Sequence, residues 1–250
     1  MNGFIFFGDF QDIEKLELIK PESIDLILTD PPYIFKVGSS KYYRTGVKGN
    51  YENYLDFMRK FFQQAYKFLK PTGNLAVFHI YNMIPTLLCA SYPVGFRLHK
   101  YFVWIKENQS GGLGRNSIGN ESSFKTAIEF ITFFRKGKNK PYYDPYSILE
   151  LTPSGKAFNY WIGNKEKDGI NFTGAKPKEL LRIFVRALSP PGGIVYDPFL
   201  GSGSIIPVCI EENRFIIGCE IDKKAQEIIK HRISQYPYAK IEIYENKKEV

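Results

Sequence analysis

The segment TDPPYIF, residues 29–35, places a carboxylate, two prolines and an aromatic ring in consecutive positions. The apolar run 23–29 has the length of a strand, so Asp30 is expected at the carboxyl end of that strand. Pro31 and Pro32 offer no N–H and fix φ, so they exclude sheet pairing and stiffen the turn. Ligands bind at this edge of open α/β sheets, which favours a site built on Asp30 and Tyr33. The alternative is a rigid connector with a capping aspartate.

A second candidate site lies in the stretch GIVYDPFLGSGSIIPVCIEENRFIIGCEID, residues 193–222. Its pattern predicts a strand, a glycine turn, a helix and a second strand that ends in an acid. Gly201 and Gly203 allow a tight turn close to a ligand, and Glu220 stands where a carboxylate can hold both hydroxyls of a ribose. Ile206 occupies the place of the third glycine of the dinucleotide fingerprint. A nucleoside ligand without phosphates therefore fits this stretch better than a dinucleotide.

The two motifs together resemble those of a known family. Residues 197–204 (DPFLGSGS) are similar to the cofactor motif of S-adenosylmethionine-dependent amino-methyltransferases that act on DNA, and residues 30–33 (DPPY) resemble their catalytic motif. The order of the motifs, with DPPY first, resembles the beta group of these enzymes. Further similar pieces are 7–9, 68–78, 95–108, 127–134 and 174–181. The resemblance covers nearly the whole chain apart from residues 136–173 and the tail.

The resemblance implies a catalytic role for each residue of the DPPY motif. The carboxylate of Asp30 and the carbonyl of Pro31 would accept hydrogen bonds from both N–H groups of an exocyclic base amine, and Pro32 would keep these acceptors rigid. This localises the nitrogen lone pair, which is otherwise delocalised into the ring. Tyr33 would stack on the base after it has been flipped from the duplex, and the methyl group would move in line from the sulfonium.

The resemblance also implies residues that bind S-adenosylmethionine. Asp9 would meet the adenine of the cofactor, and Glu220 would meet the ribose. The methionine part would be lined by Lys176, Asp197, Phe199, Gly201, Ser202 and Gly203. Residues 172–177 read FTGAKP where the family often has HPTQKP, so only the final Lys-Pro matches. Taken one by one, Asp9 could instead be a helix N-cap, Glu220 a surface acid and Phe199 a core residue.

Basic and aromatic side chains alternate in the loop that follows the DPPY motif. The residues predicted to contact DNA are Lys36, Lys41, Tyr42, Tyr43, Arg44 and Lys48, together with Arg115 in a second long loop. Cations beside aromatic rings suit phosphate contact and base stacking. The alternative is that these charges only form a solvated face. Trp161 is expected to anchor the packing of its own segment instead of stacking on a base.

These residues require a fold that brings both motifs to one edge of a sheet. Strands are expected at 4–7, 23–29, 74–79, 98–105, 127–134, 193–196 and 215–220. Helices are expected at 11–19, 51–69 and 178–188, between 79 and 98, from the glycine turn to about 213, and after 222. This order predicts an α/β, Rossmann-like methyltransferase fold with a mainly parallel, doubly wound sheet and a small target-recognition insert.

Residues 1–250 are expected to form a single methyltransferase domain. Residues 1–135 would be the catalytic half, 136–173 the target-recognition insert and 174–250 the cofactor-binding half. Two stretches without apolar period, 36–50 and 108–123, are expected to be long loops, which in compact domains are usually functional or disordered. The tail 242–250 is expected to be a frayed, solvated end.

Composition limits the classes of protein to which the chain can belong. Its hydrophobic content of 44% excludes wholesale disorder, and no run approaches the roughly 18 apolar residues of a membrane helix. The start MNGFIFFGDF lacks the basic region of a signal peptide. Widely spaced cysteines and scattered histidines predict a cytoplasmic chain without a disulfide framework or a bound metal. A net charge of +8 favours a polyanionic partner such as DNA.

The sequence therefore predicts a site-specific DNA methyltransferase that uses S-adenosyl-L-methionine and acts on the N6 amine of adenine. Cytosine N4 is the close alternative, because that branch more often carries Ser where Asp30 stands. Methylation of RNA or of a protein amide is disfavoured, since those relatives more often carry Asn there and reverse the order of the motifs. A nicotinamide-dependent oxidoreductase and a catalytically silent DNA-binding protein are the alternatives from other classes. A cognate restriction endonuclease and a homodimer both stay open.

Overall fold

A computed structural model of the chain describes residues 2–35, 47–48, 51–107, 127–152, 155–164 and 175–245. The strands of its main sheet are β1 (Gly3–Phe7), β2 (Ile24–Thr29), β5 (Leu69–His79), β6 (Phe96–Ile105), β7 (Ile128–Lys136), β8 (Tyr160–Ile162), β9 (Ile194–Asp197), β10 (Phe215–Glu220) and β11 (Ile241–Glu245). The α-helices are α1 (Tyr51–Phe68), α2 (Ile84–Ser91), α3 (Lys178–Leu188), α4 (Ile205–Glu211) and α5 (Lys223–Ser234). Short 3-10 helices are η1 (Phe10–Leu16), η2 (Tyr81–Met83) and η4 (Tyr146–Leu151).

The main sheet has the strand order β11-β1-β10-β9-β2-β5-β7-β6-β8. Among the described strands of this sheet, β7 alone runs antiparallel to its neighbours β5 and β6, and every other pair is parallel. Helices follow most of the parallel strands, as crossover connections require. The predicted α/β fold with a mainly parallel, doubly wound sheet is confirmed.

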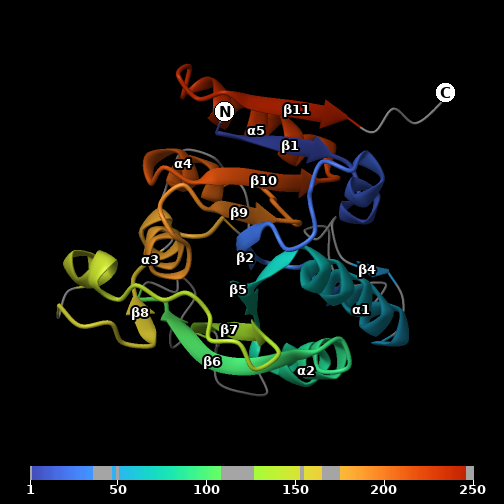
Figure 1. Cartoon of the computed structure of the whole chain (residues 1–250), viewed down its shortest axis with the longest axis vertical. Coiled ribbons are helices and arrows are strands. Elements are labelled where there is room, and N and C mark those ends of the chain that lie inside the picture. The colour runs from blue at the N-terminus through green and yellow to red at the C-terminus, as the bar shows by residue number, and fades with distance from the viewer. Residues whose placement is uncertain are drawn as a thin grey trace, which may run out of the picture.

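Both faces of the sheet are covered by helices, because successive side chains of a strand point to opposite faces. Leu26 and Leu28 of β2 are fully buried in one cluster with the apolar residues of α3, α4 and α5. Ile27, between them, belongs to a second cluster with α1 and α2. Figure 1 shows α3 and α4 on one side of the strands and α1 and α2 on the other. The near-continuous apolar runs of the sequence follow from this double burial.

The direction of winding reverses between β2 and β9. From β2 the chain passes through α1 to β5, on one side of the sheet, and from β9 it passes through α4 to β10, on the other side. The two strands pair in parallel, with Leu26 opposite Val195 and Ile27 opposite Tyr196. Their carboxyl ends, which carry Asp30 and Asp197, therefore flank the switch point where open α/β sheets bind ligands.

The segment expected as an insert, residues 136–173, contributes η4 and β8 in its described part. Strand β8 extends the sheet by pairing in parallel with β6, with Trp161 opposite Trp104. The side chain of Trp161 is buried, and its ring centroid lies 6.3 Å from that of Trp104. The prediction that Trp161 anchors the packing of this segment is confirmed.

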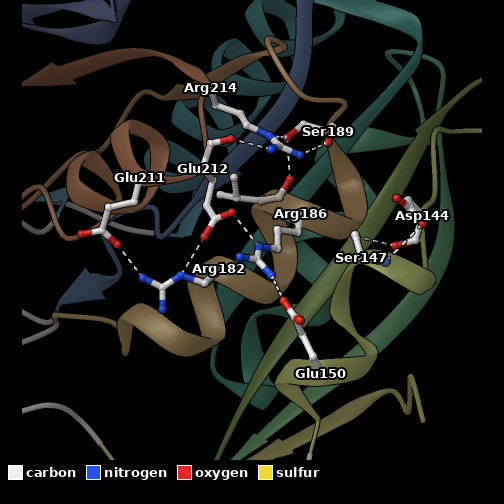
Figure 2. A network of polar contacts seen from close by, with 10 residues as sticks. Asp144, Ser147, Glu150, Arg182, Arg186, Ser189, Glu211, Glu212 and Arg214 are labelled. Atoms are coloured by element: carbon white, nitrogen blue, oxygen red, sulfur yellow. Dashed lines mark hydrogen bonds and ion pairs between the residues drawn. The ribbon is translucent and has the colours of Figure 1, made fainter. Parts of the chain in front are cut away.

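A network of ion pairs joins α3 to α4 and to η4 (Figure 2). Glu212, which follows α4, is shared by Arg182 at 2.9 Å and Arg186 at 2.6 Å, both on α3. Arg186 also pairs with Glu150 of η4, and Arg182 pairs with Glu211 of α4. The network fastens η4 to α3 and α3 to α4, the helices before and after the glycine turn of the second motif.

Two predicted elements differ from the structure. The expectation of a frayed tail from residue 242 is wrong up to residue 245, because Ile241–Glu245 form β11 beside β1, and the Tyr244 ring packs edge-on against Phe4 at 5.6 Å. An edge strand is half solvated, so β11 carries two glutamates, Glu242 and Glu245, and does not form an apolar run. The helix expected at 11–19 is the 3-10 helix η1, which ends at Leu16 because Glu17 takes a left-handed φ of 52°.

A short strand, and two kinds of feature that the described residues lack, complete the description of the fold. Within the loop expected at 36–50, Val47–Lys48 form strand β4, which pairs with β3 (Ile34–Phe35). In the described ranges, no helix is long and apolar enough to cross a membrane. The same residues contain no group of three or more His, Cys, Asp or Glu side chains that could hold a metal ion.

Candidate active site

A cavity of about 370 Å³ lies at the carboxyl ends of β2 and β9. Its lining contains the whole DPPY segment and most residues predicted to bind the cofactor, namely Asp30, Pro31, Pro32, Tyr33, Lys176, Asp197, Phe199, Gly201, Ser202 and Glu220. The two motifs, which are far apart in the chain, thus meet in one place. Of the predicted cofactor residues, only Asp9 and Gly203 do not line this cavity.

A buried hydrogen bond connects the two motif-bearing strands at the floor of the cavity. The Thr29 hydroxyl, directly before Asp30, donates to Asp197 Oδ1 at 2.6 Å. The same oxygen accepts the backbone N–H of Phe199 at 3.1 Å. Burial raises the pKa of Asp197 to about 7, although both hydrogen bonds act in the opposite direction. The carboxyl of Asp197 is therefore poised between its two protonation states near neutral pH.

Gly201 and Ser202 of the glycine turn line the cavity together with Glu220. Gly201 and Gly203 have φ of 54° and 72°, a left-handed conformation that favours glycine, and a Cβ on Gly203 would lie 2.9 Å from Ile206 Cδ1. Glu220 Oε2 accepts the N–H of Gly201 at 2.6 Å, and Oε1 accepts the N–H of Asp222 at 2.7 Å. Burial raises the pKa of Glu220 to about 7.

Two predicted cofactor residues also show the alternative role considered for them. Asp9 is the N-cap of η1 and accepts the backbone N–H of Gln11 at 2.9 Å, so its contact with a cofactor stays a prediction. Phe199 packs into an aromatic cluster, with ring centroids 5.0 Å from Phe10 and 5.5 Å from Phe61. Phe199 lines the cavity as well, so it joins the hydrophobic core to the site.

At the catalytic end of the cavity, both carboxylate oxygens of Asp30 have partners. The Tyr33 hydroxyl donates to Oδ1 at 2.9 Å, and the ammonium of Lys176 lies 2.6 Å from Oδ2. Burial, together with the nearby Asp30 charge, raises the pKa of Tyr33 well above its ordinary value, so its hydroxyl stays protonated and donates. The DPPY segment thus closes on itself through the side chains of its first and last residues.

Lys176 binds two acids, which the sequence did not suggest. Besides Asp30, its Nζ pairs with Glu129 Oε2 at 3.0 Å and lies 5.0 Å from the ring centroid of Phe78. Burial would lower the pKa of Lys176, but Asp30 and Glu129 outweigh this and raise it, so the group stays charged. The side chain lines the cavity, and its predicted contact with the cofactor stays a prediction.

Sequence reasoning missed several polar residues of the site. Thr29, Glu129, Ser204 and Asp222 line the cavity, and Lys106 pairs with Glu129. Glu129 lies in β7 and also pairs with Lys106, which follows β6, at 2.5 Å. Burial alone would raise the pKa of Glu129, but the two ammonium groups lower it to about 2. The available signal was a single acid inside the apolar strand pattern IEFITFF, because a buried strand tolerates a charge only when it is paired.

The predicted DNA contacts cannot be placed among the described residues. Lys36, Lys41, Tyr42, Tyr43, Arg44 and Arg115 lie outside the described ranges, and of Lys48 only the backbone, in β4, is described. In the chain, one of the two stretches that carry them follows the DPPY segment and the other follows β6. Their contact with DNA stays a prediction.

Comparison with known protein sequences gives the family that the two motifs resemble. The family model described as DNA methylase, of the N6/N4 type, matches residues 24–231. The chain is 28% identical to the type II methyltransferase M2.LlaDCHI of Lactococcus lactis subsp. cremoris, over 94% of this chain and 90% of that protein. It is also 28% identical to the type II methyltransferase M2.DpnII of Streptococcus pneumoniae, over 87% of this chain and 85% of that protein.

Solved structures share the fold. The PvuII DNA methyltransferase, described as cytosine-N4-specific, superimposes with a TM-score of 0.71 at 21% identity, over 97% of this chain and 95% of that one. The Thermus thermophilus protein TTHA0409, solved in complex with S-adenosyl-L-methionine, gives a TM-score of 0.70 at 20% identity, over 96% and 99%. Since the family model extends over most of its residues, this chain belongs to the N6/N4 DNA methylase family.

Proposed function

We propose that this protein transfers a methyl group from S-adenosyl-L-methionine to the N6 amine of adenine, at a specific sequence in DNA. The observation that carries the proposal is the common cavity, which is lined by the DPPY segment as well as by Gly201 and Glu220. Its volume of about 370 Å³ lies in the range of small-molecule sites. The family supplies the reaction class, and the residues of the cavity supply the proposed roles.

Glu220 suits the ribose of this cofactor. A carboxylate has about four lone-pair positions, and the two backbone N–H groups use one on each oxygen, which leaves one on each for a hydroxyl. The Gly201 turn keeps the backbone next to this carboxylate free of side-chain bulk. When bound, the cofactor supplies the electrophilic methyl group of its sulfonium.

Asp30 and the Pro31 carbonyl are the proposed acceptors for the two N–H groups of the target amine. Asp30 lies at the switch point and is partly exposed to the cavity, while Pro31 is buried. Acceptors that are fixed before the reaction stabilise the charge that develops on the nitrogen without a cost for rearrangement. Tyr33, held by its hydrogen bond to Asp30, would present its ring to the flipped base.

Cytosine N4 is the second candidate target. The PvuII enzyme, described as cytosine-N4-specific, has the same fold, so the fold does not separate the two bases. Asp30 favours adenine, because the cytosine branch more often carries Ser in that position. For the cellular role, both curated relatives named above are type II methyltransferases. We therefore propose that the protein protects DNA from a cognate restriction endonuclease.

The test is a methylation assay with labelled S-adenosyl-L-methionine and DNA of mixed sequence, followed by digestion to nucleosides and mass spectrometry. N6-methyladenine is the expected product. N4-methylcytosine alone would assign the enzyme to the second candidate target, and labelled DNA without either product would contradict the proposal. Mapping the modified positions in DNA from expressing cells then gives the recognition sequence.

A further inference from the structure

We propose that Glu129 is a positioning residue that shares the ammonium of Lys176 with Asp30 and takes it over when the target amine reaches Asp30. The proposal deepens the function proposed above and rests on it, because it requires that Asp30 receives the target amine. Nothing in the reaction itself assigns Glu129 a role, since the methyl group moves from sulfonium to nitrogen without it.

Four charged side chains of alternating sign form a row that ends at the cavity. Lys106 pairs with Glu129 Oε1 at 2.5 Å, Lys176 pairs with Glu129 Oε2 at 3.0 Å, and Lys176 pairs with Asp30 Oδ2 at 2.6 Å. Their side chains are 16%, 11%, 10% and 26% exposed, from Lys106 through Glu129 and Lys176 to Asp30. They come from four different parts of the sheet region, so only the tertiary structure builds the row.

The row creates a competition at Asp30. Tyr33 already donates to Oδ1 and Lys176 pairs with Oδ2, so a base amine that binds this carboxylate competes with them for its remaining acceptor capacity. Lys176 is the stronger competitor, because its contact is short, charged and largely shielded from water. A buried ammonium without a partner is costly, so Lys176 leaves Asp30 only if a second anion is within reach.

Glu129 is that second anion. Its Oε2 already lies 3.0 Å from Lys176 Nζ, so a small movement of the ammonium exchanges one carboxylate for the other. Lys106 holds the opposite oxygen of Glu129 and helps to keep it ionised, with a pKa of about 2 despite burial. The four charges sum to zero, and the exchange leaves that sum unchanged.

Other ionisable groups surround this row of four charges. Those that interact with Asp30 are Tyr33, Tyr54 of α1, His79 of β5 and Asp197 of β9. Burial raises the pKa of both tyrosines and lowers that of His79, so these three are neutral at pH 7. Asp197 titrates near that pH, so the assay below is carried out at one fixed pH.

The primary test replaces Glu129 with Gln, which keeps the shape and removes the second anion. Lys176 then has Asp30 as its only full charge partner in the row, so it stays on Asp30 and weakens this carboxylate as an acceptor for the target amine. In single-turnover methylation we expect a rate reduced about tenfold or more, with unchanged affinity for S-adenosyl-L-methionine. The reduction appears in the methylation rate and not in cofactor binding, because Glu129 acts on Lys176, and Lys176 in turn acts on Asp30, which receives the target amine. Glu129→Asp, which restores the charge, should recover part of the rate.

A double-mutant cycle separates this role from a merely structural one. In a Lys176→Met background the competitor is gone, so Glu129→Gln should cost less than twofold there. The matched control is Glu212→Gln. Glu212 is also a nearly buried acid shared by two cations, Arg182 and Arg186 (Figure 2), but it joins α3 to α4 and does not line the cavity. Its variant should lower thermal stability and leave the methylation rate of the folded enzyme within twofold.

The outcomes distinguish this inference from the proposed function. Methylation by the unchanged enzyme is measured first, and failure to methylate DNA would overturn the proposed function and this inference with it. If the unchanged enzyme is active and Glu129→Gln matches its rate within twofold, this inference is overturned and the proposed function stands. Equal losses from Glu129→Gln with and without Lys176 would likewise overturn it, because the exchange requires the lysine.

Discussion

The Thr29 hydroxyl donates a hydrogen bond of 2.6 Å to Asp197 Oδ1 and so joins the carboxyl ends of β2 and β9. Thr29 directly precedes the DPPY motif, and Asp197 is the first residue of the glycine-turn motif. Both side chains are buried. This bond adds to the backbone pairing of β2 with β9 and ties the catalytic segment to the cofactor segment at the switch point of the sheet.

Replacing Thr29 with Val should lower the free energy of unfolding by about 1–2 kcal/mol, since it removes the donor and leaves a buried carboxyl with one hydrogen bond fewer. The shape of the side chain is nearly preserved, so the loss reports on the hydroxyl. Chemical denaturation measures the effect, and Thr29→Ser, which keeps the hydroxyl, is the control. Equal stability of the Val and Ser variants would mean that the bond contributes nothing.

Binding of S-adenosyl-L-methionine near pH 7 should release about half a proton from Glu220. With a pKa of about 7 the carboxyl is about half protonated, and ribose hydroxyls donate to its ionised form and favour it. Calorimetry in buffers of different ionisation enthalpy measures the release. Glu220→Gln should abolish it and weaken binding by about 1–3 kcal/mol, while Asp197→Asn should leave the release in place. A buffer-independent enthalpy in the unchanged protein would remove Glu220 from the binding site.

Stability should fall as pH rises from about 4 to 7, in part because of Asp197. Its pKa is 3.8 for the free side chain and about 7 in the folded protein, so in this interval the folded state binds more protons than the unfolded state. Asp197→Asn keeps an Oδ1 that can accept from Thr29 and Phe199 but removes the titration. This variant should be more stable than the unchanged protein at pH 8 by about 1–3 kcal/mol and closer to it at pH 5. Melting temperatures across this range test the sign, and a constant difference would contradict it.

Asp30→Ala should separate binding from chemistry. We expect cofactor and DNA to bind nearly as well as in the unchanged protein, while turnover falls by roughly 100-fold or more, the scale for loss of a preorganised electrostatic partner. Tyr33→Ala should instead weaken capture of the flipped base as well as turnover, because stacking precedes the transition state. Circular dichroism first establishes that both variants are folded. Methylation by Asp30→Ala at nearly the normal rate would reject the catalytic assignment.

Replacing Lys41, Arg44 and Lys48 together with Ala tests the predicted DNA contact. If all three bind phosphates, the slope of log affinity against log salt should decrease in magnitude by about 2–3. Titrations of fluorescent DNA at several salt concentrations give the slope. An unchanged slope would mean that these residues form only a solvated face.

The sequence by itself determined most of the helices and strands, together with the catalytic motif and the cofactor motif. Apolar runs of strand length, the proline pair after Asp30 and the turn at Gly201 and Gly203 depend on backbone sterics and on local burial, which are properties of neighbouring residues. The pattern therefore predicted the mainly parallel sheet. It also predicted that Asp30 directly follows a buried strand and that Glu220 is the last residue of another. Strand β11 was missed, because among the described strands this edge strand pairs with β1 alone, which lies at the other end of the chain.

Only the tertiary structure decided which charges meet. Lys176 was expected at the cofactor, yet its ammonium lies between Asp30 and Glu129, which stand on different strands and are brought together by the order β2-β5-β7. Pairing between buried charges depends on distances of a few ångströms in a region of low dielectric, and no local pattern encodes such distances. The same holds for Thr29 and Asp197, whose hydrogen bond exists because β2 and β9 are neighbours where the winding of the sheet reverses.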